Sequence, residues 1–249
     1  MAQTMLDGGR SALHRRARIV AAIVGSGATA GIGALLNRLC RLAVDEMTLS
    51  GCTVVLMSQT VQMGTFGSVE GGAGPRAATL AELQFALGEG PCIQACASSM
   101  PVLVPDLAVE AAGRWPMFAP AAVEAGIRAE FSLPLSVGPR GIGTFDLCRD
   151  EPGMLTGEQL ADAFTAADIA CDAVLSLPET FGNADLARLL DGTGADRLVV
   201  HQATGMIAAQ LDENVSNALA RLRAAGFETG RSIYDIARDV VARRVRFDG

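Results

Sequence analysis

The cysteine side chains of this sequence are candidates for catalysis. The chain has six cysteines, and Cys92 and Cys96 lie four residues apart, where the sequence indicates a loop. Such a pair could cycle between thiol and disulfide, but a reactive thiol needs a local cationic environment. The alternative is packing, because the cysteines lie among apolar residues and a buried thiol behaves as a small hydrophobe. Packing is the interpretation that we favour.

Motifs for other chemistry are absent from the sequence. It has no C-x-x-C pair and only two histidines, His14 and His201, so we expect no metal site. No nucleophile elbow, Walker loop or H-E-x-x-H motif occurs. Asp106 and Asp146 lie near strand ends, but nothing in the sequence pairs them for hydrolysis. Gly88-Glu-Gly-Pro lacks the spacing of a dinucleotide fingerprint and predicts a turn, or part of a ligand rim. We therefore expect neither an enzyme nor a bound cofactor.

Arginine is concentrated toward the C-terminal end of a chain whose net charge is -7. From residue 188 onward there are nine arginines against eight acidic residues, and the whole chain has no lysine. Arginine matches phosphate in a bidentate geometry that lysine lacks. These arginines could form a phosphate-binding face, or they could be a solvated surface. Those that mostly fall outside the apolar helix faces are Arg221, Arg223, Arg231, Arg238, Arg243, Arg244 and Arg246.

Residues 199–247 predict three short helices in succession, because apolar residues recur at helical spacing in three consecutive stretches. Asp212 is suited to cap the second helix and Ser232 the third, with Asp235 approximating a capping box. Gly226 and Gly230 indicate the turn between those two helices. Three such helices can close a small core and leave polar faces free for a partner. The apolar positions are Val200, Ala203, Ile207 and Leu211, then Val215, Ala218, Leu219 and Leu222, then Ile233, Ile236, Ala237, Val240 and Val241.

Residues 30–178 mix helices with strands joined by short turns, which predicts an α+β domain with an antiparallel sheet. Gly138-Pro-Arg-Gly141 indicates a hairpin, and Thr156-x-x-Gln159 is a capping box. The helix behind that box carries a heptad-like apolar stripe that would suit a dimer seam. Residues 179–194 are the predicted linker to the C-terminal helices. We expect strands at 52–57, 61–69, 101–104, 127–137 and 141–148, and helices at 34–47, 78–86, 115–125 and 156–177.

Residues 1–29 precede these domains and begin with a basic cluster that includes His14, Arg15, Arg16 and Arg18. The uncharged run that follows, residues 19–37, superficially resembles a signal or anchor segment. Glycine and hydroxyl side chains dilute this run too much for a membrane span. We expect an N-terminal helix with a flexible glycine break, no membrane association, and a cytoplasmic protein.

Five motifs in residues 30–178 resemble a GAF domain of the kind found in bacterial signalling proteins. They are Leu87-Gly-Glu-Gly-Pro-Cys, Pro101-Val-Leu-Val-Pro-Asp-Leu, Trp115-Pro-Met-Phe, Pro134-Leu and Gly143-Thr-Phe-Asp-Leu. The resemblance implies the GAF fold and a sensory role, and it leaves the ligand unidentified. If a small molecule binds, Cys92, Trp115 and Phe118 are the residues that we expect at its pocket, although Trp115 and Phe118 are more typical of packing.

The C-terminal stretch, residues 195–249, resembles an ANTAR domain, the three-helix RNA-binding module of transcription antitermination regulators. The matching motifs are Gln202-Ala-Thr-Gly-Met, Ala218-Leu-Ala-Arg-Leu-Arg and Gly230-Arg-Ser-Ile, continued by Ile236-Ala and Val240-Val. The resemblance implies that the chain binds paired stem-loops of nascent transcripts and lets RNA polymerase read on. Because two stems need two modules, it also implies a homodimer.

Carried over position by position, the same resemblance implies roles for six residues in RNA binding. Gly205 would allow close approach of the RNA, and Arg223 and Arg231 would bind phosphate or bases. Ser232 would cap its helix and contact RNA. The six residues are Gln202, Gly205, Met206, Arg223, Arg231 and Ser232.

Two functions of other classes stay open beside the antitermination regulator, which is our first hypothesis. The larger domain could be a GAF-fold thiol enzyme similar to free-methionine sulfoxide reductases, with Cys92 and Cys96 as its thiols. The C-terminal helices could instead form a helix-turn-helix that docks in a DNA major groove.

Overall fold

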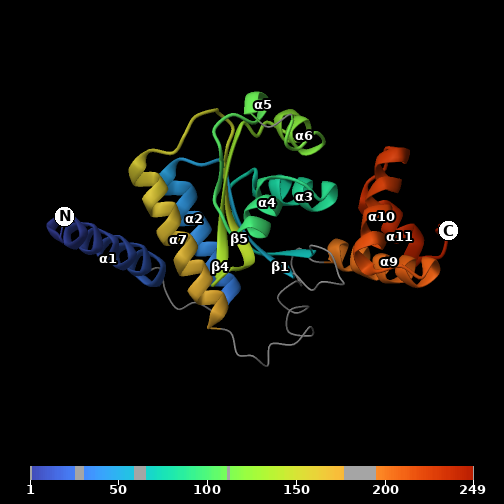
Figure 1. Ribbon diagram of the computed structural model, residues 1–249, viewed down its shortest axis with the longest axis horizontal. Coiled ribbons are helices and arrows are strands. Elements are labelled where there is room, and N and C mark those ends of the chain that lie inside the picture. The colour runs from blue at the N-terminus through green and yellow to red at the C-terminus, as the bar shows by residue number, and fades with distance from the viewer. Residues whose placement is uncertain (1, 26–30, 59–65, 111–112, 177–194, 249) are drawn as a thin grey trace.

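The structure is a computed structural model that describes residues 2–25, 31–58, 66–110, 113–176 and 195–248 (Figure 1). The predicted linker at 179–194 and residues 26–30 of the predicted glycine break lie outside this part of the chain. In chain order the elements are α1 (Ala2–Gly25), α2 (Ile32–Met47), β1 (Gly51–Ser58), β2 (Phe66–Ala73), α3 (Ala77–Leu87), α4 (Pro91–Ser98), β3 (Val102–Val104), α5 (Leu107–Glu110), α6 (Phe118–Glu124), β4 (Ala129–Val137), β5 (Arg140–Arg149), α7 (Gly157–Leu175), α9 (Ala195–Leu211), α10 (Val215–Thr229) and α11 (Ile233–Val241).

A five-stranded sheet in the order β2-β1-β5-β4-β3 forms the centre of the larger domain. Each neighbouring pair of strands is antiparallel. Phe145 of β5 pairs with Val54 of β1 on one side and with Leu133 of β4 on the other. Because side chains alternate along a strand, these three apolar side chains point to the same face of the sheet. The α+β domain with an antiparallel sheet, predicted from the sequence, is confirmed.

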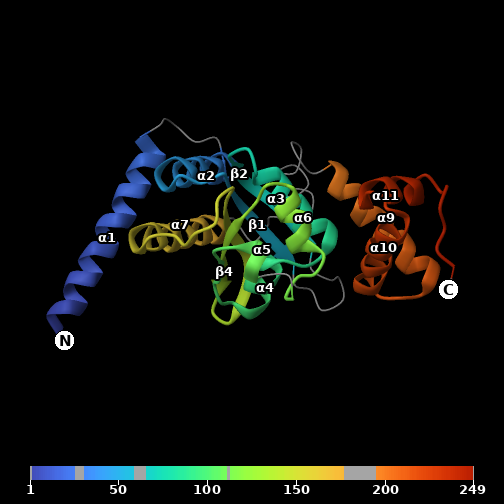
Figure 2. The same cartoon turned by 90° about the horizontal axis from the view of Figure 1, so that it is seen from above.

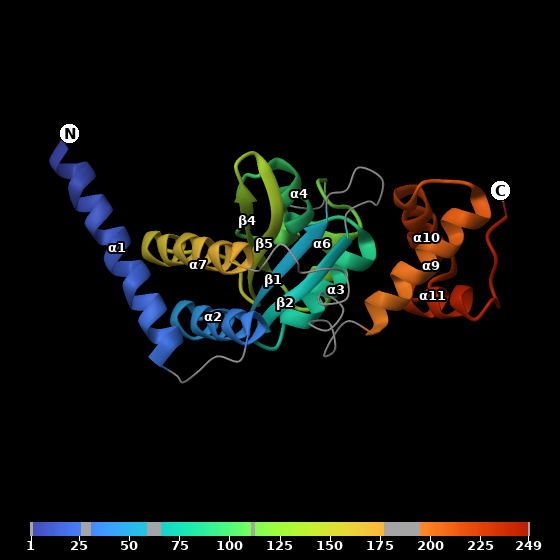
Figure 3. The ribbon, with the colours of Figure 1, turned by 90° about the horizontal axis from the view of Figure 1, so that it is seen from below.

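Helices α2 and α7 cover that apolar face, and Figures 2 and 3 show α1 crossing the ends of both. Ile19 and Ile23 of α1 are buried against the core of the domain. Arg18 forms ion pairs with Glu46 of α2 and with Asp162 of α7. The N-terminal helix predicted from the sequence is thus a packed part of the larger domain.

The stripe of α7 that the sequence predicts as a dimer seam faces mainly into its own domain. Ala167 is buried, and Leu160, Cys171 and Val174 are half-buried against the core. Phe164 alone among these stripe positions is exposed, at 39%. Thr156 and Gln159 form the predicted capping box at the start of α7.

Helices α3 and α4 cover the opposite face of the sheet (Figure 1). The turn between them has the predicted chemistry: Gly88 ends α3 with φ 69°, Gly90 precedes α4 with φ 136°, and Pro91 is the first residue of α4. Glu89 of this turn accepts a hydrogen bond from the amide of Phe118 at 2.8 Å. The turn therefore also fixes the start of α6.

Helices α9, α10 and α11 form the predicted three-helix bundle beside α3 (Figures 1 and 2). Ser232 caps α11 as predicted, accepting a hydrogen bond from the amide of Tyr234 at 3.2 Å. Gly230 ends α10 in the left-handed conformation, with φ 62°. The buried core of the bundle is Val200, Ala203, Ile207, Ala218, Leu219, Leu222, Ile233, Ile236, Ala237 and Val240.

Three local predictions for the bundle were wrong. Asn214, not Asp212, caps α10: its side chain accepts a hydrogen bond from the amide of Asn217 at 2.9 Å. Gly226 lies inside α10, where its missing side chain lets the chain that enters α11 pass close: a Cβ there would be 3.2 Å from the carbonyl oxygen of Arg231. Asp235 does not complete a capping box, because it pairs with Arg238 instead.

One prediction for the larger domain was also wrong. Cys92 and Cys96 do not flank a loop, since Pro91 starts helix α4 and both cysteines lie in it. Gly71 and Gly72 lie in β2. Glycine is needed in this strand because a Cβ on Gly71 would lie 2.8 Å from Leu36 Cβ of α2. Within the described part of the chain, no helix is long and apolar enough to cross a membrane.

Candidate functional site

The residues that the ANTAR resemblance assigns to RNA binding lie on α9, on α10 and in the segment that enters α11. Gln202 and Gly205 lie exposed on α9, three residues apart and therefore on one face. A Cβ added to Gly205 would meet nothing within 4 Å, so a partner can approach this backbone closely. Met206 is half-buried and packs on the core of the bundle, so most of its side chain supports α9 from within.

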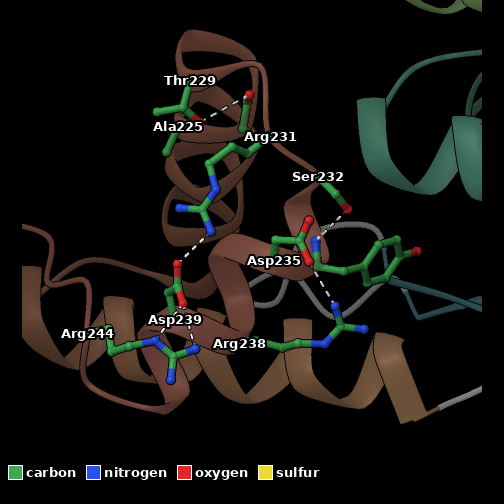
Figure 4. Close-up of polar contacts among 10 residues, drawn as sticks. Ala225, Thr229, Arg231, Ser232, Asp235, Arg238, Asp239 and Arg244 are labelled. Carbon is green, nitrogen blue, oxygen red and sulfur yellow. Dashed lines mark hydrogen bonds and ion pairs between the residues drawn. The ribbon is translucent and has the colours of Figure 1, made fainter.

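Arg231 and Ser232 lie where the chain enters α11 (Figure 4). Arg231 Nη2 is 2.6 Å from Asp239 Oδ2, and Arg244 Nε donates to the other oxygen of that carboxylate at 2.8 Å. These hydrogen bonds hold the pKa of Asp239 below its usual value. Because two guanidinium groups share one carboxylate, this end of the bundle keeps a positive charge toward solvent.

The other arginines of the bundle differ in whether they form an ion pair with an acidic side chain. Arg221 pairs with Glu213 at 2.5 Å. Arg243 and Arg246 are exposed and, among the residues that the structure describes, form no ion pair. The resemblance assigned no role to these two cations, although both belong to the arginine-rich C-terminal stretch that the sequence analysis identified.

Arg223 lies in the contact between the bundle and the larger domain. Its Nη2 donates a hydrogen bond to the carbonyl oxygen of Phe85 in α3, at 2.7 Å. Gly88 leaves room for it, because a Cβ there would lie 2.5 Å from Arg223 Nη1. Burial lowers the pKa of Arg223 to about 10, and its Nε has no hydrogen-bond partner among the described residues. The guanidinium predicted to bind RNA is therefore directed into the domain contact.

Arg223, Arg231 and Ser232 nevertheless border one open cleft between the bundle and the end of α3. Met117 and Phe227 form apolar parts of its wall. Phe227 is 69% exposed, and no motif in the sequence indicates a role for it. A surface that combines guanidinium groups with an exposed ring has the chemistry that stacks bases and binds phosphates.

The two cysteines proposed as a redox pair lie on one face of α4, four residues apart. Cys92 is 2% exposed and Cys96 is 1% exposed, and neither forms a disulfide within the described part of the chain. Burial raises the pKa of Cys92 well above its usual value, and the nearby Asp146 and Glu130 raise it further. A thiol in these surroundings stays protonated at neutral pH, and the protonated form is a poor nucleophile.

The three residues assigned to a ligand pocket are separated in the structure. Cys92 borders a small cavity with Val55 and Met57 of β1. Trp115 and Phe118 pack edge to face, with ring centroids 6.5 Å apart, in a different apolar cluster. The same small cavity is bounded by Arg197, Arg223, Ala81, Gln84, Phe85 and Ile93, so its walls come from both domains.

A buried polar cluster that the sequence analysis missed lies on the α3 and α4 face of the sheet. Ser132 donates a hydrogen bond to Glu130 Oε1 at 3.2 Å, and Thr144 donates to Asp146 Oδ2 at 2.8 Å. Glu130 Oε2 and Asp146 Oδ1 have no donor among the described residues. The sequence contains a signal for this cluster, because charged residues rarely occupy the inward positions of strands as apolar as β4 and β5.

Burial dominates the ionisation of this cluster. It raises the pKa of Asp146 to about 7, and it raises the pKa of Glu130 well above its usual value, with Asp146 adding to the effect. Burial therefore favours the neutral form of Glu130, while Asp146 titrates near physiological pH. The unused oxygens could be satisfied by a water molecule or by a small polar ligand. Within the described residues, no group of three or more His, Cys, Asp or Glu side chains could hold a metal ion.

Comparisons with known proteins concern the larger domain. A family model described as GAF domain matches residues 29–169, and no RNA-binding family is matched. The GAF domain from Acinetobacter phosphoenolpyruvate-protein phosphotransferase is 13% identical, with a TM-score of 0.50 over 66% of this chain and 93% of that chain. Free methionine-R-sulfoxide reductase from Neisseria meningitidis is 16% identical, with a TM-score of 0.45 over 66% of this chain and 91% of that one. A search of the curated proteins finds no match.

Proposed function

The chain belongs to the GAF domain family, and from this premise we propose that it is a signal-responsive transcription antitermination regulator. GAF domains are in general sensor and dimerisation modules. In this proposal the GAF domain receives the signal, and the bundle of α9, α10 and α11 binds paired stem-loops of nascent RNA. A homodimer supplies one bundle for each stem, and bound RNA lets the polymerase read on.

The observation that carries the proposal is the cleft bordered by Arg223, Arg231 and Ser232. Three of the six residues that the ANTAR resemblance names for RNA contact meet at this one place, one from α10 and two from the segment that enters α11. Phe227 adds an exposed ring beside them. Sequence-specific RNA recognition usually targets unpaired loop bases, which stack on rings and guanidinium planes. The cleft offers both groups.

A second surface, on α9, supports the same proposal. Gln202 offers an amide that can bond to base edges, and Gly205 leaves the backbone beside it open. Arg243 and Arg246 add free positive charge at the C-terminal end of the bundle. Loop recognition at the cleft and phosphate contacts from these arginines would together account for the local positive excess in an acidic protein.

No catalytic role is part of this proposal. The buried and protonated state of Cys92 is unfavourable for thiol chemistry, and Cys96 is equally buried. The direct check is turnover of free methionine sulfoxide by the parent chain and by Cys92→Ser. Turnover that depends on Cys92 would replace the present proposal with the enzyme hypothesis.

The proposal is tested with the full chain and a fluorescein-labelled pool of tandem stem-loop RNAs with randomised loops. Arg231→Ala should weaken binding about tenfold and reduce the salt dependence of log K by about one phosphate contact. Asp239 stays paired in this variant, because Arg244 also contacts it. Arg140→Ala removes an equal charge from the exposed hairpin between β4 and β5, and should leave binding unchanged.

Two results would contradict the proposal. Equal binding by Arg231→Ala and Arg140→Ala would show that the cleft is not an RNA surface. Stronger competition by duplex DNA than by unlabelled stem-loop RNA would favour the helix-turn-helix alternative.

A further inference from the structure

Helix α3 of the GAF domain is the place where all three helices of the bundle are held. Arg197 of α9 places its guanidinium 4.5 Å above the ring of Phe85 and donates to the carbonyl oxygen of Ala81 at 3.1 Å. Arg223 of α10 donates to the carbonyl oxygen of Phe85. Tyr234 of α11 stacks on the Phe85 ring, with centroids 6.2 Å apart and planes at 17°.

Glu82, one turn before Phe85 on α3, completes this contact. The hydroxyl of Tyr234 donates to its Oε2, and Arg197 Nη2 lies 3.4 Å from its Oε1. Phe85 itself is buried together with the core of the bundle rather than with the GAF core. One aromatic ring and one carboxylate of α3 therefore organise a contact with three separate helices.

Arg223 has weaker hydrogen-bond acceptors in this contact than a phosphate of RNA would provide. In the described structure it has a carbonyl acceptor and a buried Nε without a partner. Its pKa falls to about 10, which shows that burial penalises its charge. A phosphate would provide a charged, bidentate acceptor for the same guanidinium. The docked state is held by the contacts of Phe85 and Glu82, while Arg223 would be better satisfied outside it.

We propose that the docking of the bundle on α3 is an autoinhibitory latch, which withholds Arg223 from RNA until the bundle is released. This inference rests on the proposed function, because it concerns the regulation of RNA binding by the same bundle residues, among them Arg223, Arg231 and Ser232. A signal from the GAF domain would reach the latch through α3. Gln84 of α3 points inward and accepts a hydrogen bond from the amide of Cys92 at 2.7 Å, which connects α3 to the start of α4. Arg197 and Arg223 are among the residues that line the small cavity beside Cys92. A ligand or rearrangement there would act directly on the latch.

The test opens the latch from the GAF side and leaves every residue of the bundle unchanged. Phe85→Ala removes the ring contacts, and Glu82→Gln removes the carboxylate that Arg197 and Tyr234 share. Glu124→Gln, an exposed glutamate of α6, is the matched control for the loss of charge. Each full-length variant is measured for hydrogen exchange in α3 and α9, and for binding of the tandem stem-loop RNA pool.

The latch predicts that both variants exchange faster in α3 and α9 and bind RNA more tightly, while the control matches the parent. If the docked state holds about nine molecules in ten, release should lower the apparent Kd about tenfold. Adding Arg223→Ala to Glu82→Gln should abolish that gain, because the released guanidinium is then missing.

The contradicting outcomes separate the latch from the proposed function. Faster exchange with unchanged RNA affinity overturns the latch and leaves RNA binding standing. Unchanged exchange in both variants also overturns it, because the docked state is then not held by these contacts. If neither the parent nor the opened variants bind the RNA pool, the proposed function fails and the latch fails with it.

Discussion

Arg223 Nη2 lies 2.7 Å from the carbonyl oxygen of Phe85, although the two residues are 138 positions apart in the chain. This hydrogen bond joins α10 of the C-terminal bundle to α3 of the GAF domain. It also places Arg223, which the ANTAR resemblance assigns to RNA binding, next to the cavity beside Cys92. The GAF domain and the proposed RNA-binding bundle are thus in contact through the side chain of Arg223.

Gly88 should control whether Arg223 keeps this position. A Cβ at Gly88 would lie 2.5 Å from Arg223 Nη1, so Gly88→Ala should displace the guanidinium and speed hydrogen exchange in α3 and α10. Alanine at φ 69° also costs roughly 1 kcal/mol of backbone strain. Gly138→Ala is the matched control, since Gly138 has φ 59° and nothing within 4 Å of its added Cβ. Equal exchange in both variants would mean that Arg223 accommodates the methyl group without leaving.

Asp146 should make the protein less stable as pH rises. Its folded pKa of about 7 lies above its unfolded pKa of about 4, so the folded state binds the proton more tightly. The stabilisation is complete below the unfolded pKa and is lost as pH rises through the folded pKa, by up to about 4 kcal/mol. Urea unfolding of the parent should therefore show a midpoint that decreases from pH 5 to pH 8.

Asp146→Asn should flatten that decrease, because the substituted side chain no longer titrates. Asp45→Asn serves as the control, since Asp45 is exposed on α2. It should keep the pH dependence of the parent. Parallel curves for parent and Asp146→Asn would assign the titration to another group, with Glu130 the first to examine because burial also raises its pKa.

The thiols of α4 should react slowly in the folded protein. Iodoacetamide attacks the thiolate, and burial raises the pKa of Cys92 well above its usual value. Cys171 is half-buried and is the internal reference, so it should be alkylated before Cys92 and Cys96 at pH 8. Mass spectrometry of peptides after timed labelling gives the order. Fast modification of Cys92 in the native state would instead support thiol chemistry at this site.

The capping box of α7 should stabilise the GAF domain measurably. Thr156 accepts a hydrogen bond from the amide of Gln159 at 3.2 Å, and the Gln159 side chain accepts one from the amide of Thr156 at 3.0 Å. Thr156→Ala removes the first of these and should lower the free energy of unfolding by about 1 kcal/mol. Thr165→Ala makes the same change inside α7, where alanine has the better helix propensity, and should have a smaller effect. Similar losses in the two variants would argue against a role for the cap.

Sequence alone was sufficient where neighbouring residues determine the outcome. The turn at Gly88 and Gly90, the hairpin ending at Gly141 and the capping box at Thr156 follow from backbone preferences within a few residues. The three helices of the bundle follow from apolar residues repeated at helical spacing. Errors at this level, such as choosing Asp212 over Asn214 as a cap, arose because two suitable residues stood close together.

The candidate site depended on contacts between distant parts of the chain. In the sequence Arg223 is one of seven C-terminal arginines that mostly fall outside the apolar helix faces, and only docking against α3 separates it from exposed Arg231. Glu130 and Asp146 look like single charges in two strands until the pairing of β4 with β5 brings them together. Burial, and with it the pKa of each group, is a property of the assembled core.

The antiparallel α+β domain, the three-helix bundle and the resemblance from which RNA is proposed as a ligand could all be predicted from local patterns and motifs. The convergence of Arg197, Arg223 and Tyr234 on Phe85 and Glu82 is visible only in the folded protein. The physical reason is that each of these contacts joins residues more than a hundred positions apart. No local preference encodes such a contact, which forms only when two folded domains pack together.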